Sequence, residues 1–326
     1  MRDTEYLSET SAGLSERIRR DKMAEENIKA DAKVNPDADN AGAGSGEETK
    51  AASASEASAW APSEMPAEKI SFFTSIIAVF QFFTILPLGN CRDYEAFPRR
   101  LYLSPLAGWL VGAAGGAVFV LFMHLNMGIF AAAAAVATIM VLYGFNHFDG
   151  VLDLGDGLMA HTSREKRIKA LTDQNIGAGG TACGMFLILL TVAAVISIPA
   201  EIVFFALIIA EVAAKYVQVL FLVFGRPLRE GMFSYLHSFA KRRFAIYALI
   251  VCLPLLLLPI TPLAYPGAAL GALAVFFVLK GLSYRLFGGV NGDITGAANE
   301  LTRLAVLTII AAITGLPADI GAVLII

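Results

Sequence analysis

Three aspartates recur at helical spacing in the segment NHFDGVLDLGDG, residues 146–157. On a helix that turns about 100° per residue, Asp149, Asp153 and Asp156 fall within a stripe of about 60°. Without a partner, these carboxylates would repel one another and raise each other's pKa values. Mg²⁺ would keep them ionised, because it prefers oxygen ligands and shares them with substrate phosphates. The segment therefore predicts a magnesium site, with His147 as a candidate to orient a phosphate or a ligand. A solvated acidic cap at a helix start is the alternative.

A second acidic pair lies in the segment GGVNGDITGAANE, residues 288–300. Asp293 and Glu300 are seven residues apart, so on a helix they lie within about 20° of one face. Gly296 and Ala297 fall between them on that face and leave a hollow. Two acidic helix faces that meet would hold one or two Mg²⁺ ions and a nucleotide diphosphate. An ordinary glycine-rich loop before a charged helix start is the alternative interpretation.

Basic residues lie between the two acidic segments, in REKRIKALTDQNIG at residues 164–177. Arg164 and Arg167 are candidates to bind phosphate, because a guanidinium offers a two-pronged donor to phosphate oxygens. The neighbouring lysines fit the excess of basic residues in cytoplasmic loops instead. Asp173 is left open as a further ligand, a general base or a helix cap.

Apolar helices are the elements that would position these residues. Of the 326 residues, 56% are apolar and 16% are charged, and residues 1–70 hold 24 of the 53 charged side chains. A water-soluble domain usually has about 25% charged residues. Residues 71–326 have too few charges to solvate a globule of their size, so we exclude a soluble enzyme. Eight apolar stretches follow the first 69 residues, at about 70–87, 101–124, 127–148, 180–199, 202–224, 244–260, 263–286 and 304–326. Most are long enough to cross a bilayer, which predicts an all-α polytopic transmembrane helical bundle with seven or eight membrane segments.

Charge divides the chain into two expected parts. Residues 1–66 form an acidic tail that we expect to be disordered, because it has few large apolar groups to pack. Residues 67–326 form the expected transmembrane catalytic domain, in the lipid bilayer of the cell membrane. Thirteen Lys and Arg side chains lie in four loops, at residues 88–100, 149–177, 225–243 and 287–303. Such loops face the cytoplasm, so we expect the site there too. The sequence leaves open whether the first apolar stretch spans or re-enters, and therefore on which side the tail lies.

Other residue patterns carry less chemistry. Glu211 and Lys215 are four residues apart inside an apolar stretch, and we interpret them as a mutual ion pair. Nucleic-acid binding is not expected, because no long basic stripe stands on a soluble face. Cys91, Cys183 and Cys252 are too far apart in the sequence to indicate a zinc site or a disulfide framework.

Three segments resemble the adenosylcobinamide-GDP ribazoletransferase (cobalamin synthase) family: HFDGVLDLGDGL (147–158), REKRIKALTDQNIGAGG (164–180) and GGVNGDITGAANEL (288–301). The resemblance covers about residues 72–326. It implies an integral membrane enzyme that needs Mg²⁺. Such an enzyme joins adenosylcobinamide-GDP to α-ribazole, or to its 5′-phosphate, and releases GMP in the last steps of cobalamin biosynthesis.

The resemblance also implies roles for individual residues. Metal and substrate acids would be Asp149, Asp153, Asp156, Asp293 and Glu300. The candidates for catalysis are Asp149, Asp153, Asp156, Asp173 and Glu300. The candidates for substrate binding are His147, Arg164, Arg167 and Asn291. Ile85 and Gln174-Asn175 depart from the family, which often has a basic residue at the first position and Ser-Arg at the second. Asn291 stands where the family usually has Thr.

Two other classes stay open. The first is another membrane transferase that depends on Mg²⁺, either a CDP-alcohol phosphotransferase, whose DG-xx-AR segment is absent here, or a UbiA-like prenyltransferase with two Asp-rich loops. The second is a divalent-cation transporter, which would need its acids at mid-bilayer rather than at the ends of spans. The sequence does not fix the number of metal ions, the general base, or whether the protein forms a homo-oligomer.

Overall fold

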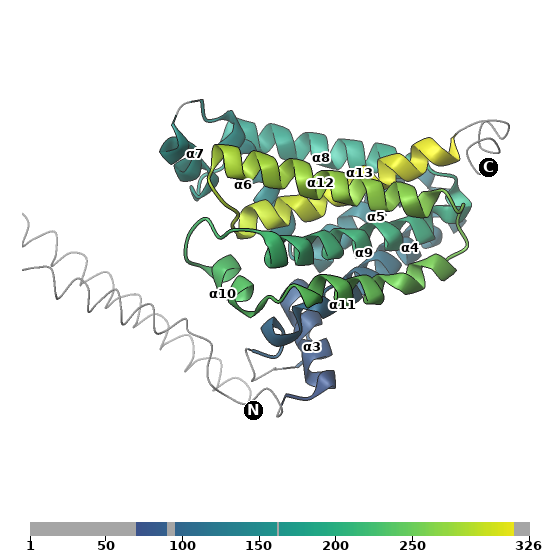
Figure 1. Cartoon of the computed structure of the whole chain (residues 1–326). Helices are drawn as coiled ribbons and strands as arrows, with labels where there is room; N and C mark the ends of the chain where they lie inside the picture. The colour runs from purple at the N-terminus through teal and green to yellow at the C-terminus, as the bar shows by residue number, and fades with distance from the viewer. Residues whose placement is uncertain (1–69, 90–94, 162, 316–326) are drawn as a thin grey trace, which may run out of the picture. The chain divides into compact units, whose positions relative to one another are not determined.

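The structure is a computed structural model that describes residues 70–89, 95–161 and 163–315 (Figure 1). The expected tail at residues 1–66 lies outside these ranges. Apart from an isolated bridge between Pro227 and Val290, the described residues form helices and loops, which confirms the all-α prediction. The helices are α3 (Phe72–Phe83), η2 (Pro98–Leu103), α4 (Pro105–His124), α5 (Gly128–Leu142), α6 (Asn146–Met159), α7 (Arg164–Leu171), α8 (Ala178–Ile196), α9 (Ala200–Phe224), α10 (Met232–Phe239), α11 (Arg243–Cys252), η3 (Leu253–Leu257), α12 (Ala264–Leu286) and α13 (Gly292–Thr314).

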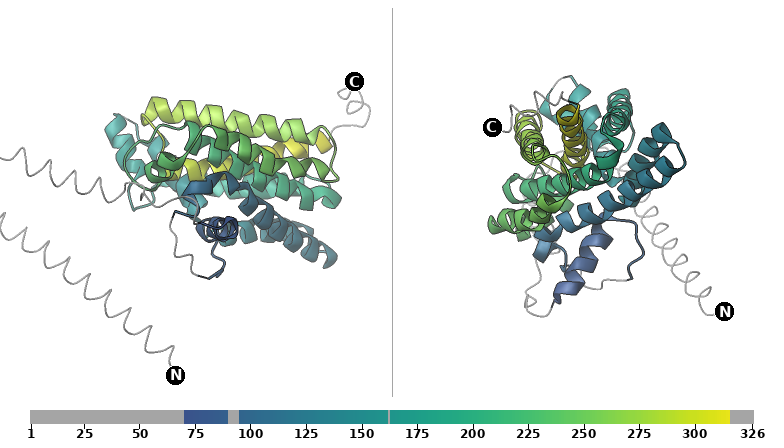
Figure 2. Two further views of the ribbon diagram at one scale, coloured as in Figure 1. Left: turned by 60° about the horizontal axis from the view of Figure 1, so that its bottom comes forward. Right: turned by 90° about the vertical axis from the view of Figure 1, so that its right-hand side faces the viewer.

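Helix α9 lies at the centre of the bundle, with buried side chains on every side. Helices α4, α11, α12 and α13 pack around it, and Figure 2 shows the long helices running side by side. Glycines bring α4 very close to α9. A Cβ at Gly108 would lie 2.6 Å from the Glu211 carbonyl oxygen, and one at Gly112 would lie 2.7 Å from Ile208 Cα. Small residues four apart allow such close contact between membrane helices.

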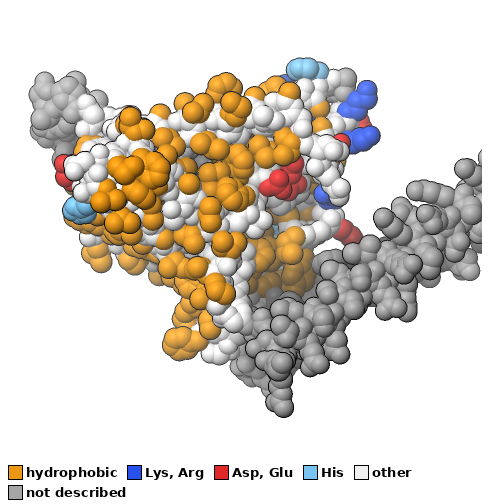
Figure 3. Space-filling view, turned by 180° about the vertical axis from the view of Figure 1, so that it is seen from behind, with side chains coloured by type: hydrophobic (Ala, Val, Ile, Leu, Met, Phe, Trp, Pro, Cys, Tyr) orange, Lys and Arg blue, Asp and Glu red, His pale blue; other side chains and the backbone are white. Residues whose placement is uncertain are grey.

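Five helices are long and apolar enough to cross a membrane, namely α4, α8, α9, α12 and α13. Helices α5 and α6 are long and apolar enough to cross a membrane only when they are taken together, and the chain bends by 94° at the break between them. Figure 3 shows apolar side chains over most of one face of the bundle, with the visible Lys and Arg side chains gathered at one end. Large apolar groups such as Phe186 on α8 and Phe277 on α12 are exposed. These features support a multi-pass membrane protein.

The count of seven or eight membrane segments is not confirmed, because three of the apolar stretches do not form a full-length straight helix. Helix α3 has only 12 residues, whereas about 20 are needed to cross the hydrocarbon core. The α5–α6 stretch breaks at Gly144 and Phe145, which both have φ of +60°. Helix α11 ends at Cys252 and continues as the short η3, where Pro254 has no N–H for the helix ladder.

The last membrane helix begins earlier than expected. Residues 287–303 were expected to form a loop, yet α13 begins at Gly292. Asn291 explains this start, because its side-chain Oδ1 accepts a hydrogen bond from Ile294 N at 3.1 Å and so caps the helix. The second acidic segment is therefore the first half of a long helix.

The elements that carry the chemistry lie at one end of the bundle. Helix α7, helix α10 and the connection from α12 to α13 all lie at this end (Figure 1). Three of the four basic loops are located here. The two acidic segments therefore share one end, as the magnesium hypothesis requires.

Candidate active site

Helix α6 packs with its backbone directly on the first turns of α13. A Cβ at Gly150 would lie 2.3 Å from the Asp293 carbonyl oxygen and 3.1 Å from Ala297 N. Only glycine at this position allows the two helices to come so close. The hollow that was expected between Asp293 and Glu300 is therefore filled by α6, and this contact brings the two acidic segments together.

Three carboxylates from the two helices lie within electrostatic reach of one another. The charges of Asp293, Asp149 and Asp156 all act on Asp153, which is partly buried, and Asp149 also acts on Asp293. We call Asp149, Asp153 and Asp293 the acidic cluster. Its members come from segments about 140 residues apart in the sequence, and the packing of α6 on α13 brings these segments together.

Two polar residues interact with the Asp293 carboxylate, one by a hydrogen bond and one by its positive charge. Asn291 Nδ2 donates a hydrogen bond to Asp293 Oδ2 at 2.6 Å, so the residue that caps α13 also orients this carboxylate. Arg229, in the loop between α9 and α10, is a positive charge that acts on Asp293. Arg229 could not be singled out from the sequence, because nothing in the local pattern separates it from the other basic residues of its loop.

Asp156 has a structural role that the sequence did not predict. Its two carboxylate oxygens accept hydrogen bonds from Gly177 N at 2.7 Å and from Gly180 N at 2.8 Å. These amides belong to the first turn of α8, where backbone N–H groups have no partner within the helix. Asp156 therefore fastens α8 to α6, and it faces the acidic cluster from one side.

Glu300 lies deep inside the bundle, away from the acidic cluster. Its side chain is 2% exposed and forms an ion pair with Arg303, which also pairs with Glu211 on α9. Seven residues along a helix correspond to about 10 Å, so Glu300 is two turns below Asp293. The structure does not bring Glu300 to the predicted magnesium site, because the pairing with Arg303 draws its carboxylate towards α9.

Lys215 is the centre of a second buried polar group. Its Nζ donates a hydrogen bond to Asn299 Oδ1 at 2.8 Å and lies 3.0 Å from His147 Nε2. The interpretation of Glu211 and Lys215 as a mutual ion pair is thus replaced by separate partners on α13 and α6. Position in an apolar stretch was the only sequence signal for these residues, and it could not identify partners on other helices.

The two predicted phosphate-binding arginines contact backbone carbonyls. Arg167 Nη1 donates to Leu158 O at 2.7 Å and to Gly157 O at 3.2 Å, near the end of α6. Arg164 is exposed, and its Nη2 donates to Arg285 O at 3.4 Å. Both lie at the end of the bundle that carries the acidic cluster, and Arg167 stabilises the C-terminus of α6.

Asp173 is exposed in the loop between α7 and α8 and is not brought to the acidic cluster. Its Oδ1 accepts hydrogen bonds from Asn175 N at 3.1 Å and from Asn175 Nδ2 at 2.9 Å. These donors hold the pKa of Asp173 below its ordinary value. A lower pKa makes the carboxylate a weaker base, and the hydrogen bonds give it the role of a turn former.

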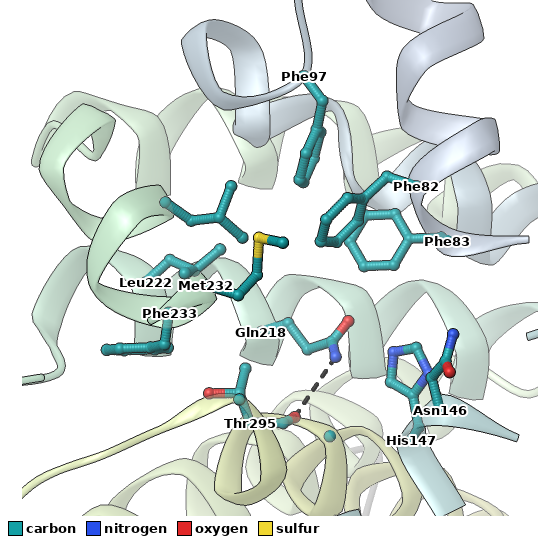
Figure 4. Close-up of a pocket in the computed structure, with 13 residues that line it drawn as sticks. Phe82, Phe83, Phe97, Asn146, His147, Gln218, Leu222, Met232, Phe233 and Thr295 are labelled. Atoms are coloured by element: carbon teal, nitrogen blue, oxygen red, sulfur yellow. Dashed lines mark hydrogen bonds between the residues drawn. The ribbon is translucent and has the colours of Figure 1, made fainter. Parts of the chain in front are cut away.

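A cavity of about 360 Å³ lies between α3, α6, α9, α10 and α13 (Figure 4). Asn146 and His147 from α6 and Gly292 and Thr295 from α13 form one side of it. Aromatic and aliphatic side chains form the rest. The residues before Asp149 and on both sides of Asp293 thus face a common space.

The acidic cluster fits Mg²⁺ by the chemistry of its donors, since it presents mutually repelling carboxylate oxygens. Among the described residues, no group of three His, Cys, Asp or Glu side chains is gathered closely enough to hold a metal ion. Mg²⁺ usually binds one or two carboxylates and completes its shell with substrate phosphates and water. The cluster therefore suits a metal that binds together with a phosphate-bearing substrate.

Comparison with known proteins places these features in a family. Residues 75–311 match the family described as Cobalamin-5-phosphate synthase. An adenosylcobinamide-GDP ribazoletransferase of Methanocella arvoryzae is 36% identical over 257 residues, which cover 72% of this chain and 94% of the relative. Proteins of the same name from Methanosarcina mazei and Archaeoglobus fulgidus are 32% and 34% identical, over 74% and 72% of this chain and 92% and 95% of the relatives. No solved structure matches the chain. The resemblance seen in the sequence is confirmed, and the chain belongs to the Cobalamin-5-phosphate synthase family.

Proposed function

We propose that this protein is a membrane enzyme that joins adenosylcobinamide-GDP to α-ribazole, or to its 5′-phosphate, and releases GMP. The family match and the names of the relatives support a role in cobalamin biosynthesis. We further propose that the reaction depends on Mg²⁺, bound by Asp153 and Asp293 together with phosphate oxygens of the substrate.

One structural observation carries this proposal. The contact at Gly150 joins the acidic segments of α6 and α13 at one end of the bundle, next to a cavity for a small molecule. A reaction between a nucleotide diphosphate and a nucleoside needs both a polyanion site and an adjacent site for the nucleophile.

The reaction requires one bond to form and one to break. A ribose hydroxyl oxygen of α-ribazole attacks the phosphorus that bears the cobinamide arm, and the bond from this phosphorus to the bridging diphosphate oxygen breaks, so that GMP leaves. When bound, Mg²⁺ would neutralise negative charge on the diphosphate and on the departing GMP. A carboxylate of the acidic cluster that is not engaged with metal accepts the hydroxyl proton. Asp149 is the exposed member of the cluster, and we propose it for this role because it can reach a substrate from solvent. Arg229 and Arg164 lie at the same end and supply positive charge for the phosphates.

We propose that the acidic cluster faces the cytoplasm from the cell membrane. The basic loops of residues 149–177 and 225–243 lie at the same end of the bundle as the cluster. Cytoplasmic loops of membrane proteins contain an excess of Lys and Arg. The nucleotide substrate would then reach the site from the compartment in which nucleotides are made.

The test uses the purified full-length protein in detergent. Incubation with adenosylcobinamide-GDP and α-ribazole should yield GMP and the joined product in equal amounts, measured by mass spectrometry. EDTA should stop the reaction, and added Mg²⁺ should restore it. Cation flux into liposomes without nucleotide, together with no GMP release, would contradict the proposal and favour a transporter.

A further inference from the structure

The cavity that contains Asn146 and Gly292 in its lining is built from five helices and the segment before η2. Phe82 and Phe83 at the end of α3, Phe97 before η2 and Phe233 on α10 surround it opposite α6, α9 and α13 (Figure 4). Its volume of about 360 Å³ lies within the range of small-molecule sites, about 300–1,000 Å³.

Aromatic rings give this cavity flat apolar walls. Phe82 and Phe97 are stacked, with ring centroids 4.3 Å apart and an angle of 27° between their planes. Phe83 meets Phe97 edge-on at 5.4 Å. Such a wall favours a planar ring over a flexible chain, because stacking on aromatic faces needs a flat partner.

Two buried polar atoms of the cavity residues have no hydrogen-bond partner among the described residues, His147 Nδ1 and Gln218 Oε1. The two side chains are 6% and 5% exposed and lie side by side. Their other polar atoms are engaged: His147 Nε2 with Lys215 at 3.0 Å, and Gln218 Nε2 with Thr295 O at 3.4 Å. Unpaired buried polar atoms are costly, so this pattern points to a ligand that supplies partners. A hydroxyl group, which both donates and accepts, pairs with either atom whichever ring nitrogen carries the proton.

The sequence positions of two lining residues relate the cavity to the acidic cluster. Asn146 is three residues before Asp149 on α6, about one helical turn away on nearly the same face, and Gly292 is next to Asp293 at the start of α13. A ligand in this cavity would therefore lie within about one helical turn of the acidic cluster.

We propose that this cavity binds α-ribazole, with its dimethylbenzimidazole base against the phenylalanine wall and its ribose directed to the acidic cluster. The proposal rests on the proposed function and identifies which part of the site takes the nucleophile. The alternative base, guanine, carries several donors and acceptors that the mainly apolar walls leave unpaired. Dimethylbenzimidazole has one free ring nitrogen and two methyl groups, which match this lining.

Direct binding tests the proposal without catalysis. Equilibrium dialysis of α-ribazole is measured with the full-length protein in detergent and with three variants. Phe82→Leu removes a stacking face and should raise Kd by about tenfold. Gly292→Leu should raise Kd at least as much, because its side chain enters the cavity where no heavy atom lies within 4 Å of the new Cβ. Phe82→Trp keeps a flat wall and should bind within about threefold of the original protein.

Phe186→Leu is the matched control. Phe186 is an exposed aromatic residue on α8, and no residue of α8 lines the cavity. Its Kd should be unchanged. Size-exclusion profiles show whether each variant is folded. Unchanged Kd in both Phe82→Leu and Gly292→Leu would overturn the assignment of the cavity. So would a failure of the original protein to bind α-ribazole.

The outcomes separate this inference from the proposed function. If the original protein releases GMP and both cavity variants keep its KM for α-ribazole, the function stands and the cavity assignment is overturned. If the protein binds α-ribazole with the expected variant pattern but releases no GMP, the cavity assignment stands and the proposed function fails.

Discussion

Lys215 Nζ lies 3.0 Å from His147 Nε2, although the two residues are 68 positions apart. Lys215 also donates a hydrogen bond to Asn299 Oδ1. The buried Lys215 side chain therefore connects the helix that carries Asp149 and Asp153 with the helix that carries Asp293. A buried polar group needs such partners, so Lys215 helps to fix the relative position of α6 and α13.

Loss of a charge in the acidic cluster should remove activity without unfolding the protein. Asp153→Asn and Asp293→Asn should each lower kcat for GMP release by about 100-fold or more, as expected for groups that stabilise the transition state. Asp173→Asn is the matched control and should keep most activity, because Asp173 is held in a turn outside the cluster. Steady-state assays at saturating Mg²⁺ measure this. Near-normal turnover in the two cluster variants would refute the assigned site.

Glu300→Gln should mainly reduce stability. It removes one of the two carboxylates paired with the buried Arg303, and breaking a buried pair typically costs about 3–5 kcal/mol. Thermal unfolding in detergent should show a clearly lower Tm. Glu201→Gln, the same change at an exposed position of α9, should leave the Tm unchanged. If the variant loses GMP release but keeps its Tm, Glu300 acts in the metal site instead.

Asp156→Ala should loosen the start of α8. The Ala variant loses both hydrogen bonds to Gly177 N and Gly180 N, and loss of a helix cap costs about 1 kcal/mol. Hydrogen exchange at these two amides should become faster. Asp156→Asn keeps an acceptor and should lose less activity than Asp153→Asn. A loss in Asp156→Asn equal to that of Asp153→Asn, with exchange unchanged, would show that Asp156 acts as a metal ligand.

Gly150→Ala should push the two acidic helices apart. The added methyl group would lie 2.3 Å from the Asp293 carbonyl oxygen, and such overpacking costs about 1–3 kcal/mol. Both Tm and GMP release should fall. Gly281→Ala on α12 is the control, because its Cβ meets no heavy atom within 4 Å. It should be neutral or stabilise the helix by up to about 1 kcal/mol. Full activity of Gly150→Ala would mean that close packing of α6 on α13 is not needed.

The sequence by itself determined the class of fold and most of the acidic cluster. The chain has few charges after residue 70 and long apolar stretches, which indicate segments in lipid. In lipid the backbone N–H and C=O groups must bond to each other, and a helix does this within one segment. Helical spacing placed Asp149 and Asp153 on one face, and the charge of the loops placed them at the same end as Asp293. Each of these inferences depends on local composition and periodicity, which the chain carries without knowledge of its contacts.

The tertiary structure alone decided which polar groups meet. Asp293 and Glu300 share a helix face, yet Asn291 holds one at the acidic cluster and Arg303 draws the other into the bundle. The left-handed backbone at Gly144 and Phe145 breaks the third apolar stretch, bends α6 by 94° from α5, and lets α6 pack on α13. Hydrogen bonds and ion pairs reach only about 3–4 Å, so these partners depend on how distant helices pack, which spacing within one segment does not specify.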